Sequence, residues 1–449
     1  MVGYPSYKHS KIDWLGDIPS HWITMPLRFT AIGNGCTFID GDWIESKNIT
    51  SEGIKYLTTG NVGPGFYKEQ GSGYITEDTF NELDCTDVFP GDLLISRLNE
   101  PIARTCIVPD LDTRIVTAVD NVIYRPNPKI CDKRYVCYWL NNAKLTEHAN
   151  VIARGATMHR ISRTMLGHLP ILLPPIDEQC VIADYLDAEC KKVDDLITRE
   201  EKRVSLLQEV RLSILTKAVL QGLNDRVETA PNKHNWLGNI PKHWKIMPLR
   251  YTATAKGCCF IDGDWIESKD IDYDGSIKYL TTGNVGSGFY KEQGLGYITE
   301  EKFKELDCTD VLPGDLLISR LNEPIARTCI VPDLGSRIVT AVDNVIFRPN
   351  PNILDRKFAC YYLNNGRLTE HANIIARGAT MHRVSRTMLG HLPVVLPPLD
   401  EQRDIVAFLD KECDQYDNRI VKANHQIDLL KEYKQSLITE VVTGKRKVC

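Results

Sequence analysis

The sequence predicts an α+β protein, in which two similar mixed α/β domains are separated and followed by long α-helices that pair as an antiparallel coiled coil. Three observations predict this fold class. One domain-sized stretch occurs twice, each copy alternates short β-rich runs with glycines, and each copy is followed by a long segment without proline or glycine. We place the domains at residues 1–175 and 223–398, and the helical segments at 176–222 and 399–449.

The internal repeat defines the organisation. Trp-Leu-Gly-Asp-Ile-Pro at residues 14–19 returns as Trp-Leu-Gly-Asn-Ile-Pro at 236–241, and residues 91–101 and 153–160 equal 314–324 and 376–383. Roughly four fifths of the positions in residues 14–170 are identical to their counterparts. A period above about 220 residues is too long for a solenoid, whose units run about 20 to 50 residues. Each copy must therefore fold around its own core.

Within the first copy, β-rich runs at residues 92–96, 103–108 and 121–124 predict short strands. Five glycines that precede these runs in the sequence predict turns and loops. They are Gly60, Gly63, Gly65, Gly71 and Gly73. The pattern predicts a mixed α/β domain that is rich in short strands.

After each copy comes Leu-Pro-Pro-x-Asp-Glu-Gln, at residues 173–179 and 396–402. The prolines end the preceding strand, Asp177 can cap a helix, and Glu178 suits its first turn. Residues 178–221 then carry apolar side chains at heptad spacing, and a helix of about 44 residues spans ~66 Å. Packing of this stripe on its own domain is the alternative to pairing of the two helices. We favour pairing, because the helix outruns a domain of this size.

Composition narrows the class of protein. The hydrophobic fraction of 43% and the charged fraction of 25% are typical of a globular chain. Apolar runs are shorter than a membrane span, and the start shows no secretory signal, so we expect a cytoplasmic protein without membrane contact. The 14 cysteines are scattered, which predicts reduced thiols rather than a metal site. A net charge of -5 means that any nucleic-acid site must be a local basic patch.

At this point the chain resembles the specificity subunit of type I restriction-modification systems. The resemblance covers essentially the whole chain and rests on the order domain, helix, domain, helix. Its motifs are Gly-Asp-Leu-Leu-Ile-Ser at 91–96, Gly-Ala-Thr at 155–157, and the Leu-Pro-Pro-x-Asp-Glu-Gln segments. It implies two target-recognition domains that each read one half of a split site in double-stranded DNA, while the helices set the gap.

The resemblance also implies partners that carry out the chemistry. Modification subunits, of which we expect two, bind S-adenosylmethionine and methylate adenine, and restriction subunits with motor activity cleave unmodified DNA. We expect no cofactor, metal or catalytic residue in this chain. Because the family has no universal base-reading residues, the resemblance indicates which regions contact DNA rather than which single residues do.

Basic residues gather without a carboxylate in residues 150–163 and 373–386. Arginine can bind guanine or phosphate through two parallel donors, and hydroxyl groups such as those of Thr157 and Ser162 suit phosphate oxygens. A solvated loop that leads into a helix is the structural alternative. The candidates are Arg154, Thr157, His159, Arg160 and Arg163, with Arg377, Thr380, His382, Arg383 and Arg386 in the second copy.

A second candidate surface is the loop at residues 97–104, which lies between two β-rich runs and returns at 320–327. A loop at a strand end can present Asn99 to adenine and an arginine to guanine. An ion pair between Arg97 and Glu100 is the alternative. The candidates are Arg97, Asn99, Arg104, Arg320, Asn322 and Arg327.

Weaker candidates lie nearer the start of each copy. Lys47 and Lys55, with Lys269 and Lys278, are placed to contact phosphate only. Trp43 and Tyr67 are aromatic residues that can stack on a base, although their spacing is more typical of core aromatics.

Two other functions compete with DNA recognition by a non-catalytic subunit. An adenine methyltransferase would need an Asn-Pro-Pro-Tyr type loop and a glycine-rich cofactor turn, which the sequence lacks. A nuclease site at Pro109 and Asp110 has no shared second carboxylate in its copy. A two-headed protein-binding scaffold without DNA specificity stays open, and salt-sensitive binding to duplex DNA separates it from our interpretation.

Overall fold

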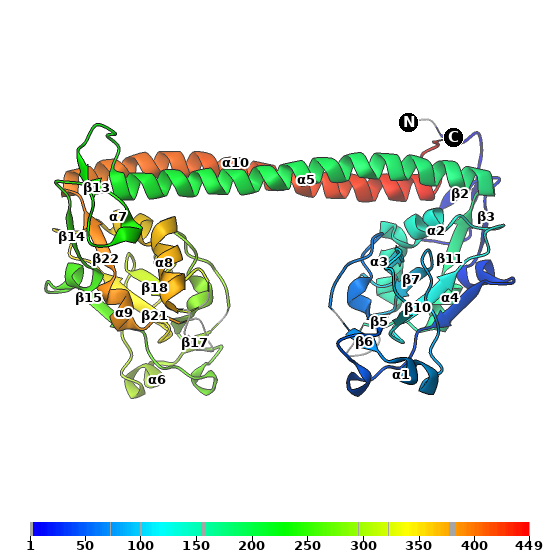
Figure 1. Ribbon diagram of the computed structural model, residues 1–449, viewed down its shortest axis with the longest axis horizontal. Helices are drawn as coiled ribbons and strands as arrows, with labels where there is room; N and C mark the ends of the chain where they lie inside the picture. Colours follow the sequence, from blue (N-terminus) through cyan, green and yellow to red (C-terminus); the bar gives the residue numbers. More distant parts are fainter. Residues whose placement is uncertain are drawn as a thin grey trace. The chain divides into compact units, whose positions relative to one another are not determined.

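The structure is a computed structural model that describes residues 3–71, 73–98, 101–153, 159–294, 296–321, 323–376 and 383–448. The chain forms two compact units (Figure 1). Unit 1 comprises Met1–Glu201 with His425–Cys449, and unit 2 comprises Lys202–Asn424. Each unit therefore holds one copy of the repeat together with a segment of each long helix.

An antiparallel sheet lies at the centre of unit 1, in the order β4-β10-β7-β8. Its strands are β4 (Thr37–Asp40), β10 (Asn121–Arg125), β7 (Leu93–Ser96) and β8 (Thr105–Ile107). The residues of β7 are buried throughout, including Ser96 at its end, so both faces of this inner strand are covered. The strands predicted at 92–96, 103–108 and 121–124 are confirmed as β7, β8 and β10.

A second sheet of unit 1 has the order β6-β5-β9, with β5 antiparallel to β6 and parallel to β9. Two short pairs, β1 with β2 and β3 with β11, complete the strands of the described residues. Their bounds are β6 (Gly73–Ile75), β5 (Ile54–Leu57), β9 (Ile115–Thr117), β1 (Tyr7–His9), β2 (Asp17–Pro19), β3 (Ile23–Pro26) and β11 (Pro170–Leu173). The helices of this copy are η1 (Leu27–Ala31), η2 (Ser46–Asn48), η3 (Thr59–Asn61), α1 (Glu77–Glu82), α2 (Lys133–Leu140), α3 (Ala143–Ile152) and α4 (Arg163–His168).

Unit 2 repeats this topology, with sheets in the orders β15-β21-β18-β19 and β17-β16-β20 and with the pairs β12-β13 and β14-β22. Its strands are β12 (Thr229–Ala230), β13 (Ile240–Pro241), β14 (Lys245–Pro248), β15 (Cys259–Asp262), β16 (Ile277–Leu280), β17 (Tyr297–Ile298), β18 (Leu316–Ser319), β19 (Thr328–Ile330), β20 (Ile338–Thr340), β21 (Asn344–Arg348) and β22 (Pro393–Leu396). Its helices are η4 (Asn235–Leu237), η5 (Leu249–Ala253), η6 (Ser268–Asp270), η7 (Thr282–Asn284), α6 (Glu300–Glu305), α7 (Arg356–Leu363), α8 (Gly366–Ala376) and α9 (Arg386–His391). The mixed helix-and-sheet character predicted for both copies is confirmed.

The two long helices are α5 (Ile176–Gln221) and α10 (Leu399–Val442). Both contribute to the cores of the units. In unit 1, Ile182 of α5 and Leu437 of α10 belong to the cluster around Trp139. In unit 2, Leu215 of α5 and Leu409 of α10 are buried in the corresponding cluster. Part of each apolar stripe is therefore core contact with a domain, which was the alternative left open by the sequence.

Charged residues also link the two long helices within each unit. In unit 1, Lys434 of α10 lies 2.8 Å from a carboxylate oxygen of Asp194 of α5. In unit 2, Arg211 of α5 lies 2.8 Å from Asp417 of α10. The helices thus contact each other as well as the domains.

The Leu-Pro-Pro-x-Asp-Glu-Gln motif attaches each helix to its domain. Because α5 already begins at Ile176, Glu178 lies in its first turn and points back at the domain. Its carboxylate accepts hydrogen bonds from the Tyr4 hydroxyl (2.7 Å) and the Trp22 indole (3.1 Å). The side chain of Gln179 bonds the backbone at Ile130 and elsewhere in the domain. We call this contact the helix joint.

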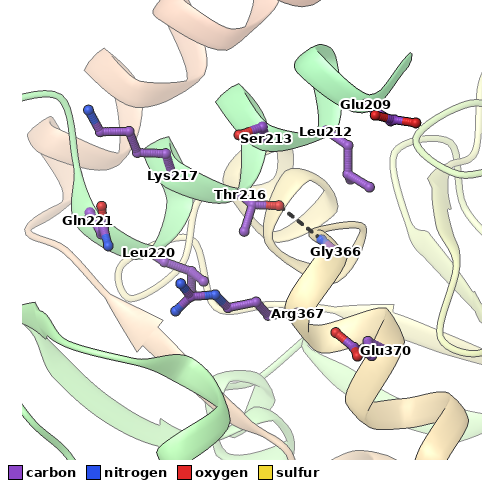
Figure 2. A pocket seen from close by; sticks show the side chains of 10 residues that line it. All are labelled: Glu209, Leu212, Ser213, Thr216, Lys217, Leu220, Gln221, Gly366, Arg367 and Glu370. Carbon is purple, nitrogen blue, oxygen red and sulfur yellow. Dashed lines mark hydrogen bonds between the residues drawn. The ribbon is translucent and has the colours of Figure 1, made fainter. Parts of the chain in front are cut away.

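A cavity of about 610 Å³ in unit 2 lies where α5 meets α8 (Figure 2). There the Thr216 hydroxyl accepts a hydrogen bond from the Gly366 N–H, at 3.0 Å, which satisfies a free donor at the start of α8. The corresponding bond in unit 1 runs from the Ala143 N–H to Thr439 of α10, at 3.1 Å. A threonine of a long helix thus caps a domain helix in both units.

Candidate nucleic-acid interface

The two surfaces proposed from the sequence lie next to each other in each unit. In unit 1, Leu98 and Arg160 form an antiparallel bridge, and the Ile161 N–H donates to the Arg97 carbonyl at 3.1 Å. In unit 2, the same bridge joins Leu321 to Arg383. The loop after the central strand and the segment before α4 or α9 therefore form one surface.

A cluster of five charged residues forms on this surface in unit 1, and we call it the arginine cluster. It comprises Arg97, Arg160 and Arg163 with Asp40 and Asp120. Arg160 Nη2 lies 2.8 Å from Asp120 Oδ1, and Arg163 Nε lies 3.6 Å from Asp40 Oδ2. Arg97 lies behind them, with its Nε 3.3 Å from Asp40 Oδ1 and its Nη2 3.9 Å from Asp120 Oδ1. The three guanidinium groups exceed the two carboxylates by one positive charge.

The same cluster forms in unit 2 from Arg320, Arg383, Arg386, Asp262 and Asp343. Arg383 lies 2.8 Å from Asp343, and Arg386 lies 3.3 Å from Asp262. The buried arginine lies 3.4 Å from Asp262 and 4.0 Å from Asp343. The geometry is thus a feature of the repeated domain and not of one copy.

Exposure divides the arginines of unit 1 into two kinds. The side chains of Arg160 and Arg163 are 43% and 44% exposed, whereas that of Arg97 is 6% exposed. Burial lowers the pKa of Arg97, and Asp40 partly offsets this effect. The Arg97 Nη2 also donates to the Val119 carbonyl at 2.5 Å. Arg160 and Arg163 can therefore reach a ligand, while Arg97 supports the cluster from inside.

Arg104 and its counterpart Arg327 lie in the interior. The guanidinium group of Arg104 donates to the carbonyls of Val62, Leu98 and Thr59, at 2.8, 2.7 and 2.9 Å. Arg327 makes the same bonds at 2.8, 2.9 and 2.9 Å. We therefore revise the assignment of Arg97, Arg104, Arg320 and Arg327 as residues that touch DNA, because their side chains are buried in the protein. They hold the loop in shape.

Two further expectations for these segments change in the structure. The segment at 150–163 lacks carboxylates in sequence, yet folding brings Asp40 and Asp120 against it, so its positive field is weaker than predicted. The Ser162 hydroxyl accepts from the Met165 N–H at 3.1 Å and caps α4, instead of standing free for phosphate. His159 is exposed beside Arg160. Seven predicted residues lie outside the described residues, namely Asn99, Arg154, Thr157, Asn322, Arg377, Thr380 and His382, and so does Glu100.

The lysine candidates differ in exposure. Lys47 and Lys269 are exposed and pair with Glu45 at 2.7 Å and Glu267 at 2.6 Å. Lys55 is nearly buried and pairs with Glu69 at 2.6 Å, and Lys278 repeats this arrangement with Glu292 at 2.5 Å. The first pair of lysines can contact a backbone phosphate, and the second pair is structural.

The aromatic candidates divide in the same way. The interpretation of Trp43 as a core residue is wrong, because it is 69% exposed and its counterpart Trp265 is 68% exposed. Tyr67 is partly buried against the core and donates to Glu69 at 2.8 Å. Of these candidates, Trp43 and its counterpart Trp265 are thus placed to contact a partner.

Sequence reasoning missed Asp40 and Asp120. Both occur in stretches that the repeat preserves, but they are far from Arg160 along the chain. Asp40 ends β4, and Asp120 immediately precedes β10, which pairs with β4 and β7. Sheet pairing therefore brings the carboxylates to the arginines, and local sequence carries no signal for it.

Metal sites, disulfides and membrane-spanning helices can be assessed for the described ranges. No group of three or more His, Cys, Asp or Glu side chains there could hold a metal ion. The described cysteines are free thiols, and most of them are buried. In the same residues, no helix has the length and apolar character that crossing a bilayer requires.

Comparison with known proteins gives one family. A model described as the type I restriction modification DNA specificity domain matches residues 29–205 and 242–429. A protein of Methanocaldococcus jannaschii, provisionally named the type I restriction enzyme MjaX specificity subunit, is 23% identical over 439 residues, which are 97% of this chain and 96% of that protein. The type I restriction enzyme EcoBI specificity subunit of Escherichia coli is 23% identical over 442 residues, which are 97% and 88% of the two chains.

A solved structure shows the same fold. It was described in work on complex assembly and conformational transition of the type I R-M system. It covers 95% of this chain and 98% of its own, with a TM-score of 0.65 and 16% identity. Since the family model matches most of the sequence in two copies, this chain belongs to the type I restriction modification DNA specificity domain family.

Proposed function

We propose that the chain is the DNA-recognition subunit of a type I restriction-modification complex in the cytoplasm. It reads a bipartite target in double-stranded DNA and directs adenine methylation and restriction by partner subunits. The observation that carries the proposal is the arginine cluster, which presents Arg160 and Arg163 in unit 1 and Arg383 and Arg386 in unit 2. Arginine is the side chain best suited to bind guanine or phosphate through paired donors.

The chemistry belongs to the partners in this proposal. Two modification subunits bind S-adenosylmethionine and transfer the methyl group, and restriction subunits translocate and cleave DNA. This chain, as a member of a specificity-domain family, supplies recognition without catalysis. Purified alone, it should incorporate no labelled methyl group into DNA, and incorporation would contradict the assignment.

We further propose that α5 and α10 act as a spacer, pairing as an antiparallel coiled coil between target-recognition domains at 1–175 and 223–398. The ion pairs Asp194 with Lys434 and Arg211 with Asp417 support it. From the first ion pair to the second, the position on α5 moves forward and the position on α10 moves backward by the same number of residues, as expected for antiparallel helices. Inserting whole heptads between Glu200 and Leu215 should change the gap in the target or abolish binding. An unchanged gap in a fully active variant would exclude a spacer role.

The repeat suggests what the target looks like. Two domains that expose the same arginines in the same geometry should prefer the same short base sequence. With antiparallel helices, the domains would be related by an approximate two-fold axis, and such proteins read inverted repeats. We expect a split palindrome or nearly one.

Sequencing that maps methylated adenines in cells that carry the chain with its modification subunit tests the proposal. A methylated split palindrome is the expected result. Two unrelated half-sites would contradict the shared readout or the two-fold relation, and a direct repeat would contradict the antiparallel pairing. Absence of any methylated motif, with binding to duplex DNA that is insensitive to salt, would instead favour a protein-binding scaffold.

A further inference from the structure

The arginine cluster contains carboxylates on a surface that the proposed function gives to DNA. Asp120 is 25% exposed and Asp40 is 31% exposed, so both carboxylates can interact electrostatically with a bound polyanion. Each carboxylate repels phosphate and thereby weakens binding to DNA of any sequence. Both nevertheless occupy the same places in unit 2, as Asp343 and Asp262.

We propose that Asp120 and Asp343 are specificity-determining positioning residues, which hold the guanidinium groups of Arg160 and Arg383 in one orientation before DNA arrives. The inference rests on the proposed function and adds to it the residue that fixes each exposed arginine. The kind of ligand is the edge of a base that offers two acceptors, such as guanine in the major groove.

The backbone around this ion pair is fixed at both ends. On one side, Arg160 forms the bridge to Leu98, and the neighbouring Ile161 N–H binds the Arg97 carbonyl at 3.1 Å. On the other side, the Arg97 N–H donates to the Asp120 carbonyl at 2.9 Å. Both partners of the ion pair are thus anchored to Arg97, so their 2.8 Å contact is set by the fold.

An oriented arginine discriminates better than a mobile one. A guanidinium group has five N–H donors in a planar fork, and it recognises a base edge only when its plane matches that of the base. With Nη2 held at Asp120, the plane of the group has a preferred direction, while 43% of the side chain stays exposed. A freely rotating arginine would instead find the nearest phosphate of any sequence.

The ion pair between Arg160 and Asp120 should contribute little to the stability of the fold. Pairs between partly exposed side chains contribute little to folding. Moreover, the Oδ1 atoms of Asp40 and Asp120 and the Nε of Arg97 are buried, and their ion pairs at 2.8 and 3.3 Å do not have the geometry of a hydrogen bond. The corresponding atoms of Asp262, Asp343 and Arg320 share this condition. A purely structural cluster would be expected to satisfy these atoms.

The test uses the complex of this chain with its modification subunits. Two duplex probes are compared, one with the motif found by mapping methylated adenines and one with both half-sites scrambled. In the Asp120→Asn and Asp343→Asn double variant, the affinity ratio between the probes should fall roughly tenfold. Binding to the scrambled probe should tighten, and its dependence on log salt should steepen by about one unit per domain, because each freed arginine contacts phosphate.

Asp13→Asn is the control for each single aspartate variant, since it also removes one carboxylate, at an exposed position where the second copy already carries Asn235. It should leave the affinity ratio unchanged. A second comparison places the aspartate variants in the Arg160→Ala and Arg383→Ala background. There they should change the ratio no further, because the proposed effect passes through the arginines.

An affinity ratio within twofold of the wild-type value in the double aspartate variant would overturn the inference and leave the proposed function standing. An equal fall in the alanine background would overturn it as well. A wild-type complex that binds both probes alike would overturn the proposed function itself. Should the asparagine variants not fold, Asp120→Glu with Asp343→Glu keeps the charge and displaces the carboxylate. That variant should lower the ratio without steepening the salt dependence, and an unchanged ratio would again contradict the inference.

Discussion

The contacts at the helix joint differ between the two units, whereas the contacts inside the two domains are nearly the same. In unit 1 the side chain of Glu178 is 11% exposed and accepts hydrogen bonds from both Tyr4 and Trp22. In unit 2 the side chain of Glu401 is 29% exposed and accepts a hydrogen bond from Trp244. Tyr4 precedes the repeated stretch, which begins at Trp14, so it is not part of what the copies share.

Inside the domains, by contrast, the contacts repeat closely. Arg104 and Arg327 bind corresponding carbonyls at nearly equal distances, and Arg160 and Arg383 each lie 2.8 Å from an aspartate. A repeated sequence therefore reproduces a contact when both partners of the contact lie within the repeat. A contact with residues outside the repeat is free to differ.

The largest effect is expected from replacing the buried arginines. Arg104→Ala and Arg327→Ala should each lower the free energy of unfolding of their unit by about 3 kcal/mol, because several buried carbonyls lose their donor. Denaturant unfolding, with hydrogen exchange to assign the unit, measures the loss. The two losses should agree within about 1 kcal/mol, as expected for identical surroundings. A clear inequality would show that the interiors are not equivalent.

Removing one exposed arginine should affect DNA binding rather than stability. We expect Arg160→Ala and Arg383→Ala to weaken binding to the mapped target by about 1 to 3 kcal/mol each, the value of a base contact. Titration of fluorescent duplexes with the complex measures the affinity, and thermal unfolding should stay close to that of the wild type. Equal losses from the two variants would support identical half-sites. Unaltered affinity and salt dependence would exclude this surface as the DNA contact.

The helix joints should respond unequally. Glu178→Gln should destabilise unit 1 by about 1 to 2 kcal/mol, and Glu401→Gln should destabilise unit 2 by less, because Glu178 is more buried and has the additional donor Tyr4. Hydrogen exchange in the first turns of α5 and α10 reports each joint separately. Equal effects would mean that the tyrosine contributes nothing.

Lowering the pH should weaken the helix joint of unit 1. Burial acts to raise the pKa of Glu178, but the hydrogen bonds from Tyr4, His21 and Trp22 and the charge of His21 outweigh it and hold the pKa below its ordinary value of 4.5. The ionised form therefore stabilises unit 1 at pH above 4.5, and this contribution is lost as the pH falls further. Wild-type unit 1 should lose stability more steeply below pH 4.5 than the Glu178→Gln variant. Parallel pH profiles would contradict the assignment.

The smallest effect is expected at the exposed lysines. Lys47→Ala and Lys269→Ala should weaken binding to all sequences alike and reduce the salt dependence by about one unit each, if both touch phosphate. Stability should not change, since their ion pairs with Glu45 and Glu267 are exposed. A variant that changes the preferred sequence would show that a lysine reads a base.

The sequence alone was enough to predict the two copies of one domain, the helices after each copy, and the strands β7, β8 and β10. These follow from repetition and from hydrophobic periodicity, which are local properties of the chain. It also identified the segments that carry Arg160 and Arg383. The joint role of Glu178 was not predicted, since its partners Tyr4 and Trp22 lie more than 150 positions away.

Which charged residues face outward depends on how the chain folds. Arg97, Arg104 and Arg160 are equivalent in sequence terms, but pairing of the strands buries the first two and leaves the third exposed beside Asp120. Burial depends on contacts between distant segments, and the cost of burying a guanidinium group is met only where carbonyls or carboxylates surround it. Charge patterns along the chain therefore indicate a candidate segment for DNA binding, while the fold determines which of the arginines a ligand can reach.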